Sequence, residues 1–155
     1  MRSCVLRLLI ISLLLPACAF APAQSSSPND KSGADAFSAE IASQILNQLH
    51  DGLESHTPQR MLSAFDPGKM NGYPEFENQV HAFFNRYASF RSFFHIVQSS
   101  SDGPKGVVLV DIQLEAAPLA PTDPPVRKNA KLRLVLERGR KGWKIVDLSP
   151  RDFFS

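Results

Sequence analysis

The spacing of apolar residues changes once along this chain, and that change constrains the fold more than any other feature. Between residues 35 and 89 the apolar side chains recur about every four positions, which is the period of one helix face. From Phe90 onward, β-branched and aromatic residues come in runs that alternate with polar residues, as in half-buried strands. The sequence therefore predicts an α+β protein in which helices come first and a sheet follows.

Three helices are expected. The first covers residues 35–54, and its apolar face comprises Phe37, Ile41, Ile45, Leu49 and Leu53. A short second helix follows Thr57 and Pro58, which supply an N-cap and a first-turn proline. The third begins at Pro74, and its aromatic stripe comprises Phe76, Val80, Phe83, Phe84 and Tyr87. We interpret this stripe as core.

Four strands are expected after the helices, over residues 90–98, 106–115, 128–138 and 143–148. On the second and third strands one face is apolar and the other mixed, which is typical of an antiparallel sheet covered on one side. The connections at 99–105 and 139–142 have the length of hairpin loops, whereas 116–126 is longer and rich in proline. The sequence thus predicts three N-terminal helices packed on a curved four-stranded antiparallel meander.

The long connection sets the pairing of the two middle strands. If residues 116–126 fold back symmetrically, Asp111 lies across from Arg133 and Glu115 lies near Lys131. Exposed cross-strand pairs of this kind contribute only about 0.2–1 kcal/mol each, so they indicate a solvated face rather than a site.

The last hairpin places one acidic residue on the apolar side of the sheet. Its short turn predicts Glu137 opposite Lys144, and Asp147 then lies on the same side as the buried leucines of the third strand. Burial there would raise the pKa of the Asp147 carboxyl and make it a candidate general base. A change of one residue in register would move it to the surface.

The N-terminal residues predict a secretory signal peptide over 1–23. Arg2 and Arg7 begin it, residues 8–15 are almost wholly apolar, and Ala21 and Ala23 form a small-x-small cleavage site. Residues 24–34 would then be a flexible leader, 35–155 the folded domain, and the protein periplasmic or secreted. An alternative is the lipoprotein-like sequence 15–18, in which a lipidated Cys18 would tether the domain to a membrane.

The positions of the cysteine and charged residues limit the reactions and the partners that can be expected of the cleaved chain. Cys4 and Cys18 both lie in the signal region, so a cleaved chain has no thiol for disulfides, metal binding or nucleophilic attack. Residues 127–144 carry eight basic residues and one acidic residue. We interpret this patch as a solvated, charged face of the sheet. Because an exported protein seldom meets nucleic acid, the functional alternative is a patch that binds an anionic lipid, a cell-wall polymer or an acidic protein.

The C-terminal residues are expected to fold back onto the domain. Ser149 and Pro150 should turn the chain so that Phe153 and Phe154 become buried together with Trp143. Leaving one such phenylalanine in water would forgo about 1.5–3 kcal/mol.

The order helix, short helix, aromatic helix and strand meander resembles the nuclear transport factor 2-like family. The resemblance covers about residues 35–154 and depends on the segments 61–66, 76–87 and 142–148. It implies the cone-shaped, cystatin-like α+β fold shared by ketosteroid isomerases, scytalone dehydratase and polyketide cyclases. It also implies a pocket at the open end of the cone, and many members are dimers or binding modules without chemistry.

The enzymes with this fold place an aspartate or histidine base and a tyrosine or second acid in the pocket, but no such set aligns with this sequence. We therefore predict no catalytic residue, no cofactor and no metal ligand. The residues expected to line a ligand pocket are Met61, Phe65, Phe84, Tyr87, His95 and Asp147.

Two functions remain open from the sequence. The first is an exported, non-catalytic binding module or accessory domain, with an apolar pocket for a small apolar molecule or with an envelope protein as partner. The second is a small isomerase, dehydratase or hydrolase that uses acid–base residues such as Asp147 and His95. A homodimer is compatible with either function.

Overall fold

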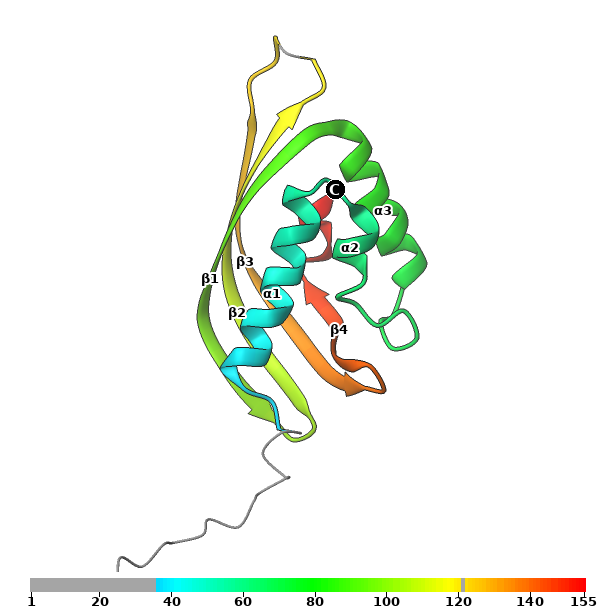
Figure 1. The fold of residues 1–155 in the computed structure, drawn as a ribbon, viewed down its shortest axis with the longest axis vertical. Coiled ribbons are helices and arrows are strands. Elements are labelled where there is room, and N and C mark those ends of the chain that lie inside the picture. The colour runs from blue at the N-terminus through cyan, green and yellow to red at the C-terminus, as the bar shows by residue number, and fades with distance from the viewer. Residues whose placement is uncertain (1–35, 121) are drawn as a thin grey trace, which may run out of the picture. The chain divides into compact units, whose positions relative to one another are not determined.

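The computed structural model describes residues 36–120 and 122–155. The signal peptide and the leader predicted for residues 1–34 lie outside this part. The elements are α1 (Ala39–Glu54), α2 (Pro58–Leu62), α3 (Tyr73–Arg86), β1 (Tyr87–Asp102), β2 (Lys105–Pro118), β3 (Val126–Gly139), β4 (Gly142–Ser149) and the 3-10 helix η1 (Arg151–Phe154). The strands form one antiparallel sheet in the order β1-β2-β3-β4. Figure 1 shows the sheet curving around the helices, which confirms the predicted α+β architecture.

Two helix ends differ from the predicted ones. Helix α1 starts four residues later than expected, because Ser38 is its N-cap and accepts a hydrogen bond from the Ile41 N–H at 3.4 Å. Phe37 therefore precedes the helix, where its ring packs edge-on against Trp143 with centroids 5.3 Å apart. At the other end of the helical part, Tyr87 does not close α3 but has extended backbone angles and begins β1.

The pairing of β2 with β3 is shifted by two residues from the predicted register. Asp111 lies opposite Lys131, and its carboxylate is 3.5 Å from Lys131 Nζ. Glu115 lies opposite Arg127, with 2.8 Å between Glu115 Oε2 and Arg127 Nε. The expected pairs with Arg133 and Lys131 were wrong because Ala116 lies opposite Val126 where the two strands meet the connection, and counting back from this pair places residue 111 opposite residue 131.

The predicted position of Asp147 on the apolar side was also wrong. The last hairpin does pair Glu137 with Lys144 as expected, but a bulge follows beside Leu136 on β3. The extra residue on β4 shifts the alternation of faces. Leu148 consequently lies opposite Leu134 in the core, and Asp147 lies opposite Val135 on the outer face.

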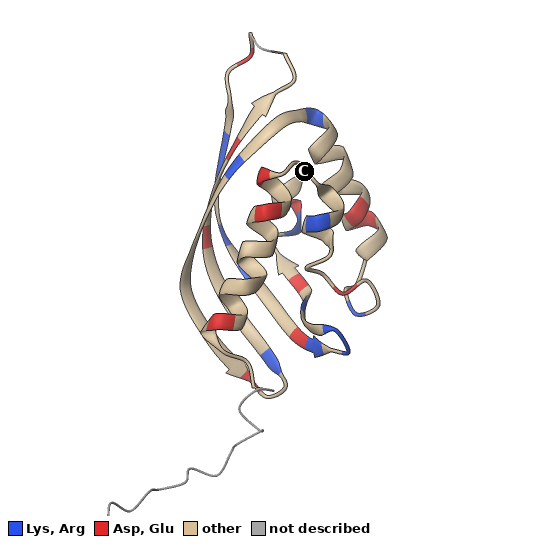
Figure 2. Ribbon diagram, in the orientation of Figure 1, with Lys and Arg blue, Asp and Glu red and all other residues tan. Residues whose placement is uncertain are grey.

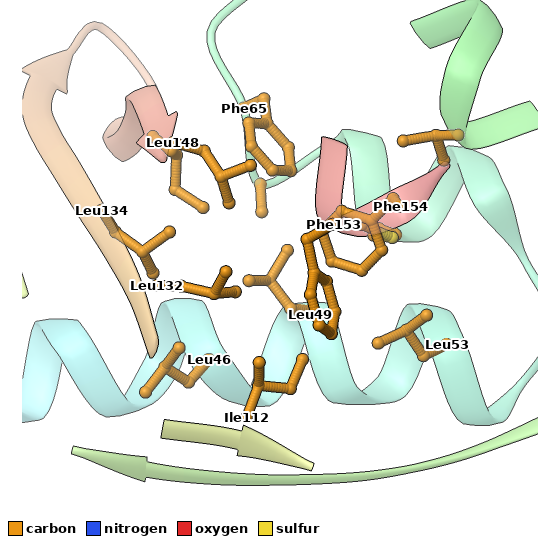
Figure 3. Close-up of a cluster of buried hydrophobic side chains, with 14 of the residues drawn as sticks. Leu46, Leu49, Leu53, Phe65, Ile112, Leu132, Leu134, Leu148, Phe153 and Phe154 are labelled. Carbon is orange, nitrogen blue, oxygen red and sulfur yellow. The ribbon is translucent and has the colours of Figure 1, made fainter. Parts of the chain in front are cut away.

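The core lies between the concave face of the sheet, the three helices and η1 (Figure 3). The peptide bond between Ser149 and Pro150 is cis, and the chain turns there so that Phe153 and Phe154 point back into the core. Phe154 is fully buried and Phe153 nearly so, as predicted. Trp143 is only half-buried, because it lies at the edge of the core beside Phe37.

Helices α1 and α2 cross at very short range. Gly52 faces the backbone of Met61, and a Cβ atom at position 52 would overlap with the Met61 main chain. This contact requires glycine in the last turn of an otherwise regular amphipathic helix. None of the described helices is long and apolar enough to cross a membrane.

Candidate functional site

The space between helices and sheet is filled by aromatic rings. Phe83 stacks on Phe90 with centroids 5.0 Å apart and meets Phe154 edge-on at 5.9 Å. Phe84 packs against Phe90 from another side, at 4.9 Å. The His56 ring stacks on Phe90 at 5.5 Å, and its Nε2 lies 2.9 Å from the carbonyl oxygen of Tyr87, to which it donates a hydrogen bond. The C-terminal helix η1 thus completes the core instead of leaving it open.

Four of the predicted ligand residues belong to this filled interior. Met61, Phe65, Phe84 and Tyr87 are each at most 7% exposed. None of them lines the cavities found in the described part of the chain. Ligand binding by these four residues therefore stays a prediction, and it would require the interior to open.

The two predicted acid–base residues do not lie inside either. His95 is exposed and pairs across the outer face with Asp111. Asp147 is partly exposed, and its Oδ1 accepts a hydrogen bond from Arg151 Nη2 at 2.7 Å. Among the cavities of the described residues, none contains both side chains. The structure therefore does not bring His95 and Asp147 together.

A hollow lies on the outer face of the sheet, and we call it the outer bowl. Its volume is about 490 Å³. Its apolar side chains are valines, and charged side chains stand around them. The lining residues are Lys69, Asn71, Asp102, Lys105, Val107, Arg133, Val135, Glu137, Val146, Asp147 and Arg151. Figure 2 shows basic and acidic residues interspersed along β3 and β4, so the basic patch expected from residues 127–144 is broken up by acids.

Ion pairs fix most of the charges in the outer bowl. Glu137 accepts from Lys69 Nζ at 2.7 Å and lies 3.0 Å from Lys105 Nζ. The hydrogen bonds from these lysines hold the pKa of the Glu137 carboxyl below its usual range, and the bond to Glu137 raises the pKa of Lys69. Arg133 differs, since its guanidinium has no ion pair or hydrogen bond among the described residues.

A second, smaller groove of about 270 Å³ lies between α1 and β1, and we call it the α1–β1 groove. His50 Nδ1 is 3.0 Å from the hydroxyl oxygen of Ser92 and 3.8 Å from Glu54 Oε1. Ser92 is 1% exposed and also donates its backbone N–H to Glu54 Oε1 at 2.8 Å. Sequence reasoning missed this cluster because His50 and Ser92 are 42 residues apart and follow no motif.

The cluster is not a nucleophilic triad. A triad needs serine on one imidazole nitrogen and the acid on the other, whereas here both lie on the Nδ1 side of His50. Within residues 36–120 and 122–155, no three His, Cys, Asp or Glu side chains are grouped so that they could hold a metal ion.

Comparison with known proteins identifies the architecture. No protein-family model and no curated protein match the sequence. Among solved structures, a conserved protein from Planctomyces limnophilus superposes with a TM-score of 0.61 at 11% identity, over 70% of this chain and 91% of its own. A protein from Streptomyces avermitilis, assigned as a dehydratase of the nuclear transport factor 2-like family, gives 0.60 at 15% identity over the same shares. A candidate scytalone dehydratase from Novosphingobium aromaticivorans gives 0.63 at 8% identity, over 70% of this chain and 79% of its own.

This chain has the nuclear transport factor 2-like fold. The resemblance inferred from the sequence is thereby confirmed at the level of the fold. Structures with the nuclear transport factor 2-like fold include proteins assigned as dehydratases, so the fold is compatible with an enzyme as well as with a binding protein. In this domain, concave surfaces lined by polar groups, among them the outer bowl and the α1–β1 groove, lie at the surface rather than in the interior.

Proposed function

We propose that this protein is an exported, non-catalytic binding module that takes its ligand in the outer bowl. The observation that supports this most directly is the pairing of two of the bowl's three acids, Glu137 and Asp147, with Asp102 at its rim as the third. Glu137 and Asp147 are held by lysine and arginine, so neither carboxylate is free to remove a proton at neutral pH. A site in which most of the charges are fixed in ion pairs is suited to recognition rather than to proton transfer.

The chemistry of the bowl favours a small molecule that carries an acidic group beside an apolar part. The unpaired guanidinium of Arg133 can form a bidentate contact with a carboxylate or phosphate. Val107, Val135 and Val146 offer the apolar part a surface beside it. This ligand replaces the wholly apolar one expected from the sequence, because the apolar interior is occupied by core side chains.

Export through a signal peptide over residues 1–23 is part of the same proposal. The charge pattern of Arg2 and Arg7 ahead of an apolar run supports it. A lipid anchor at Cys18 is the alternative form of export, and it would hold the outer bowl near a membrane surface.

A ligand screen by thermal shift, followed by calorimetry, tests the bowl. The screen should contain small carboxylates and small phosphate esters as separate sets, each with and without an apolar group. We expect a hit whose affinity falls at least tenfold in Arg133→Ala. The matched control is Lys131→Ala, which removes an exposed charge from the same face of β3 without touching the bowl. Equal loss in both variants, or a hit indifferent to Arg133, would contradict the proposal.

An acid–base enzyme in the α1–β1 groove is a second candidate function. The hydrogen-bonded pair of His50 and Ser92 lines an open groove, and neighbours of this fold are assigned as dehydratases. If this function is correct, proton exchange or water elimination on a test substrate should disappear in His50→Gln and persist in His95→Gln. Activity that survives in His50→Gln would exclude it.

A further inference from the structure

Strand β1 ends the sheet with nothing paired to its far side. Its only strand neighbour among the described residues is β2. The opposite edge of the sheet is covered: Phe65 bridges to Ile145 on β4, and the N–H of Asp66 donates to the carbonyl oxygen of Ile145 at 2.9 Å. The β1 edge therefore offers backbone donors and acceptors to any strand that reaches it, apart from the N–H of Ser92, which donates to Glu54.

One hydrogen bond shows which residues of β1 face this edge. Because Ser92 donates its N–H to Glu54 rather than to β2, its backbone groups point away from the sheet. Phe94 and Ile96 alternate with Ser92 and direct their backbone groups the same way. Their half-buried side chains also line the α1–β1 groove.

A bulge divides β1 into two halves. It lies between Ile96 and Gln98 and adds one residue to the strand relative to β2. The alternation therefore shifts by one residue, and beyond the bulge Ser99 and Ser101 are the residues that face the free edge.

The exposed segment lacks the residues that usually protect an edge strand. Residues 92–101 contain no Lys, Arg, Asp, Glu or Pro. Two of their apolar side chains stand in solvent, with Phe93 63% exposed and Val97 45% exposed. Arg91 and Asp102 flank the segment with opposite charges, and neither forms an ion pair among the described residues.

We propose that β1 pairs antiparallel with β1 of a second copy of this chain, with the two-fold axis between Ile96 and Val97. The bulges of both copies then lie at the axis. On both sides of the axis, edge-facing residues lie opposite edge-facing residues: Phe94, for example, lies opposite Ser99 of the partner subunit. This register also places Arg91 opposite Asp102 of the partner subunit, both on the outer face. The two four-stranded sheets become one, and the edge-facing backbone groups between Phe94 and Ser99 gain partners.

The choice of a second copy rests on this self-complementarity. A register centred on His95 would bring Phe94 opposite the partner's Ile96, but beyond the bulge it would set edge-facing groups against groups that point to β2. It would also leave Arg91 and Asp102 apart. The inference does not depend on the ligand proposed for the outer bowl.

Cysteine cross-linking of the full chain tests the register, with Cys4 and Cys18 replaced by serine so that no other thiol is present. Val97→Cys lies beside the axis and should form a covalent dimer on mild oxidation. Gln113 is also exposed, but it lies on β2, one strand away from the interface, so Gln113→Cys should remain monomeric. Cross-linking at Gln113 but not at Val97 would overturn the proposal.

Sedimentation of the unmodified chain and of three variants tests the interface itself. The unmodified chain should be a dimer. The Ser99→Pro variant should be a folded monomer, because proline removes an N–H that faces only the free edge. Arg91→Asp and Asp102→Arg should each weaken dimerisation about two- to thirtyfold, and the double reversal should restore it. A monomeric unmodified chain, or a dimer that is unaffected by Ser99→Pro and both reversals, would refute the pairing.

Discussion

Lys128 on β3 donates from its Nζ to the backbone carbonyl of Phe153 at 3.0 Å, and so ties the strand to the last helical turn. The same ammonium also donates to the carbonyl of Ser155 at 2.6 Å and lies 5.3 Å from the centroid of the Phe83 ring. Burial lowers the pKa of Lys128, which is the cost of placing an ammonium group against aromatic rings. This unfavourable desolvation is offset by the two hydrogen bonds to backbone carbonyls and by the contact with the π face of the Phe83 ring.

Removing the C-terminal turn should destabilise the domain strongly. Deletion of residues 151–155 takes Phe153 and Phe154 out of the core, and each buried phenylalanine is worth about 1.5–3 kcal/mol. We expect a fall in Tm on the order of 10 °C, measured by calorimetry. Leu119→Ala, which truncates a side chain that is 63% exposed, is the control and should leave Tm nearly unchanged. A deletion variant that melts with the full chain would show that the turn adds no stability.

Replacing Lys128 should weaken the attachment of η1 to β3. In Lys128→Met the apolar stem is kept but both hydrogen bonds to the C-terminal carbonyls are lost. We expect a loss of about 1–3 kcal/mol in urea unfolding and faster amide exchange in η1. Lys131→Met, on the outer face of the same strand, should change neither quantity.

A single methyl group should disrupt the contact between α1 and α2. Alanine normally stabilises a helix interior by about 1 kcal/mol over glycine. In Gly52→Ala, however, the Cβ would overlap with the backbone of Met61, and backbone cannot rotate away as a flexible side chain can. We expect a net loss of about 1–3 kcal/mol in urea unfolding. Gly68→Ala has only an ordinary contact of 3.5 Å and should be neutral.

The outer bowl should contribute to acid sensitivity through Glu137. The pKa of this carboxyl is lowered in the folded protein from an ordinary value of 4.5. As the pH falls, Glu137 therefore becomes protonated in the unfolded chain at a higher pH than in the folded protein. The stabilisation is therefore complete above about pH 4.5 and is lost as the pH falls through the folded pKa. In Glu137→Gln the decline in unfolding free energy below pH 4.5 should become shallower, by up to about 1 kcal/mol. Asp123→Asn, in the loop before β3, should keep the unmodified acid profile.

N-terminal sequencing of the exported protein tests the predicted targeting. Cleavage after Ala23 should leave Gln24 as the first residue. A chain that begins at a lipid-modified Cys18 would support the anchored form instead, and retention of Met1 would rule out both.

Some of the structure follows from the sequence because local spacing determines it. The four-residue repeat of Ile41, Ile45 and Leu49 requires one buried helix face, and Thr57 with Pro58 marks the next helix start. The pairing of Glu137 with Lys144 could be predicted because a two-residue turn leaves little freedom in register.

Other features depend on single-residue offsets that no local pattern reports. The bulge beside Leu136 moves Asp147 from the core to the outer face, and the pairing of Ala116 with Val126 sets the partners of Asp111 and Glu115 two residues away from the expected ones. Likewise, the apolar stripe predicts that Phe83 is buried but not whether a ligand or Phe154 of η1 fills the space beside it. That outcome depends on the packed volume of the whole interior.

The edge-on contact between Phe37 and Trp143 gives the protein a built-in optical reporter. Trp143 is its single tryptophan, and the indole Nε1 is buried without a hydrogen-bond partner in the described part of the chain. All tryptophan emission therefore originates at the junction where the residues entering α1 meet the start of β4. The emission should be blue-shifted while Phe37 packs against Trp143. A shift of the emission to longer wavelengths should report the loss of this contact, separately from unfolding of the rest of the core.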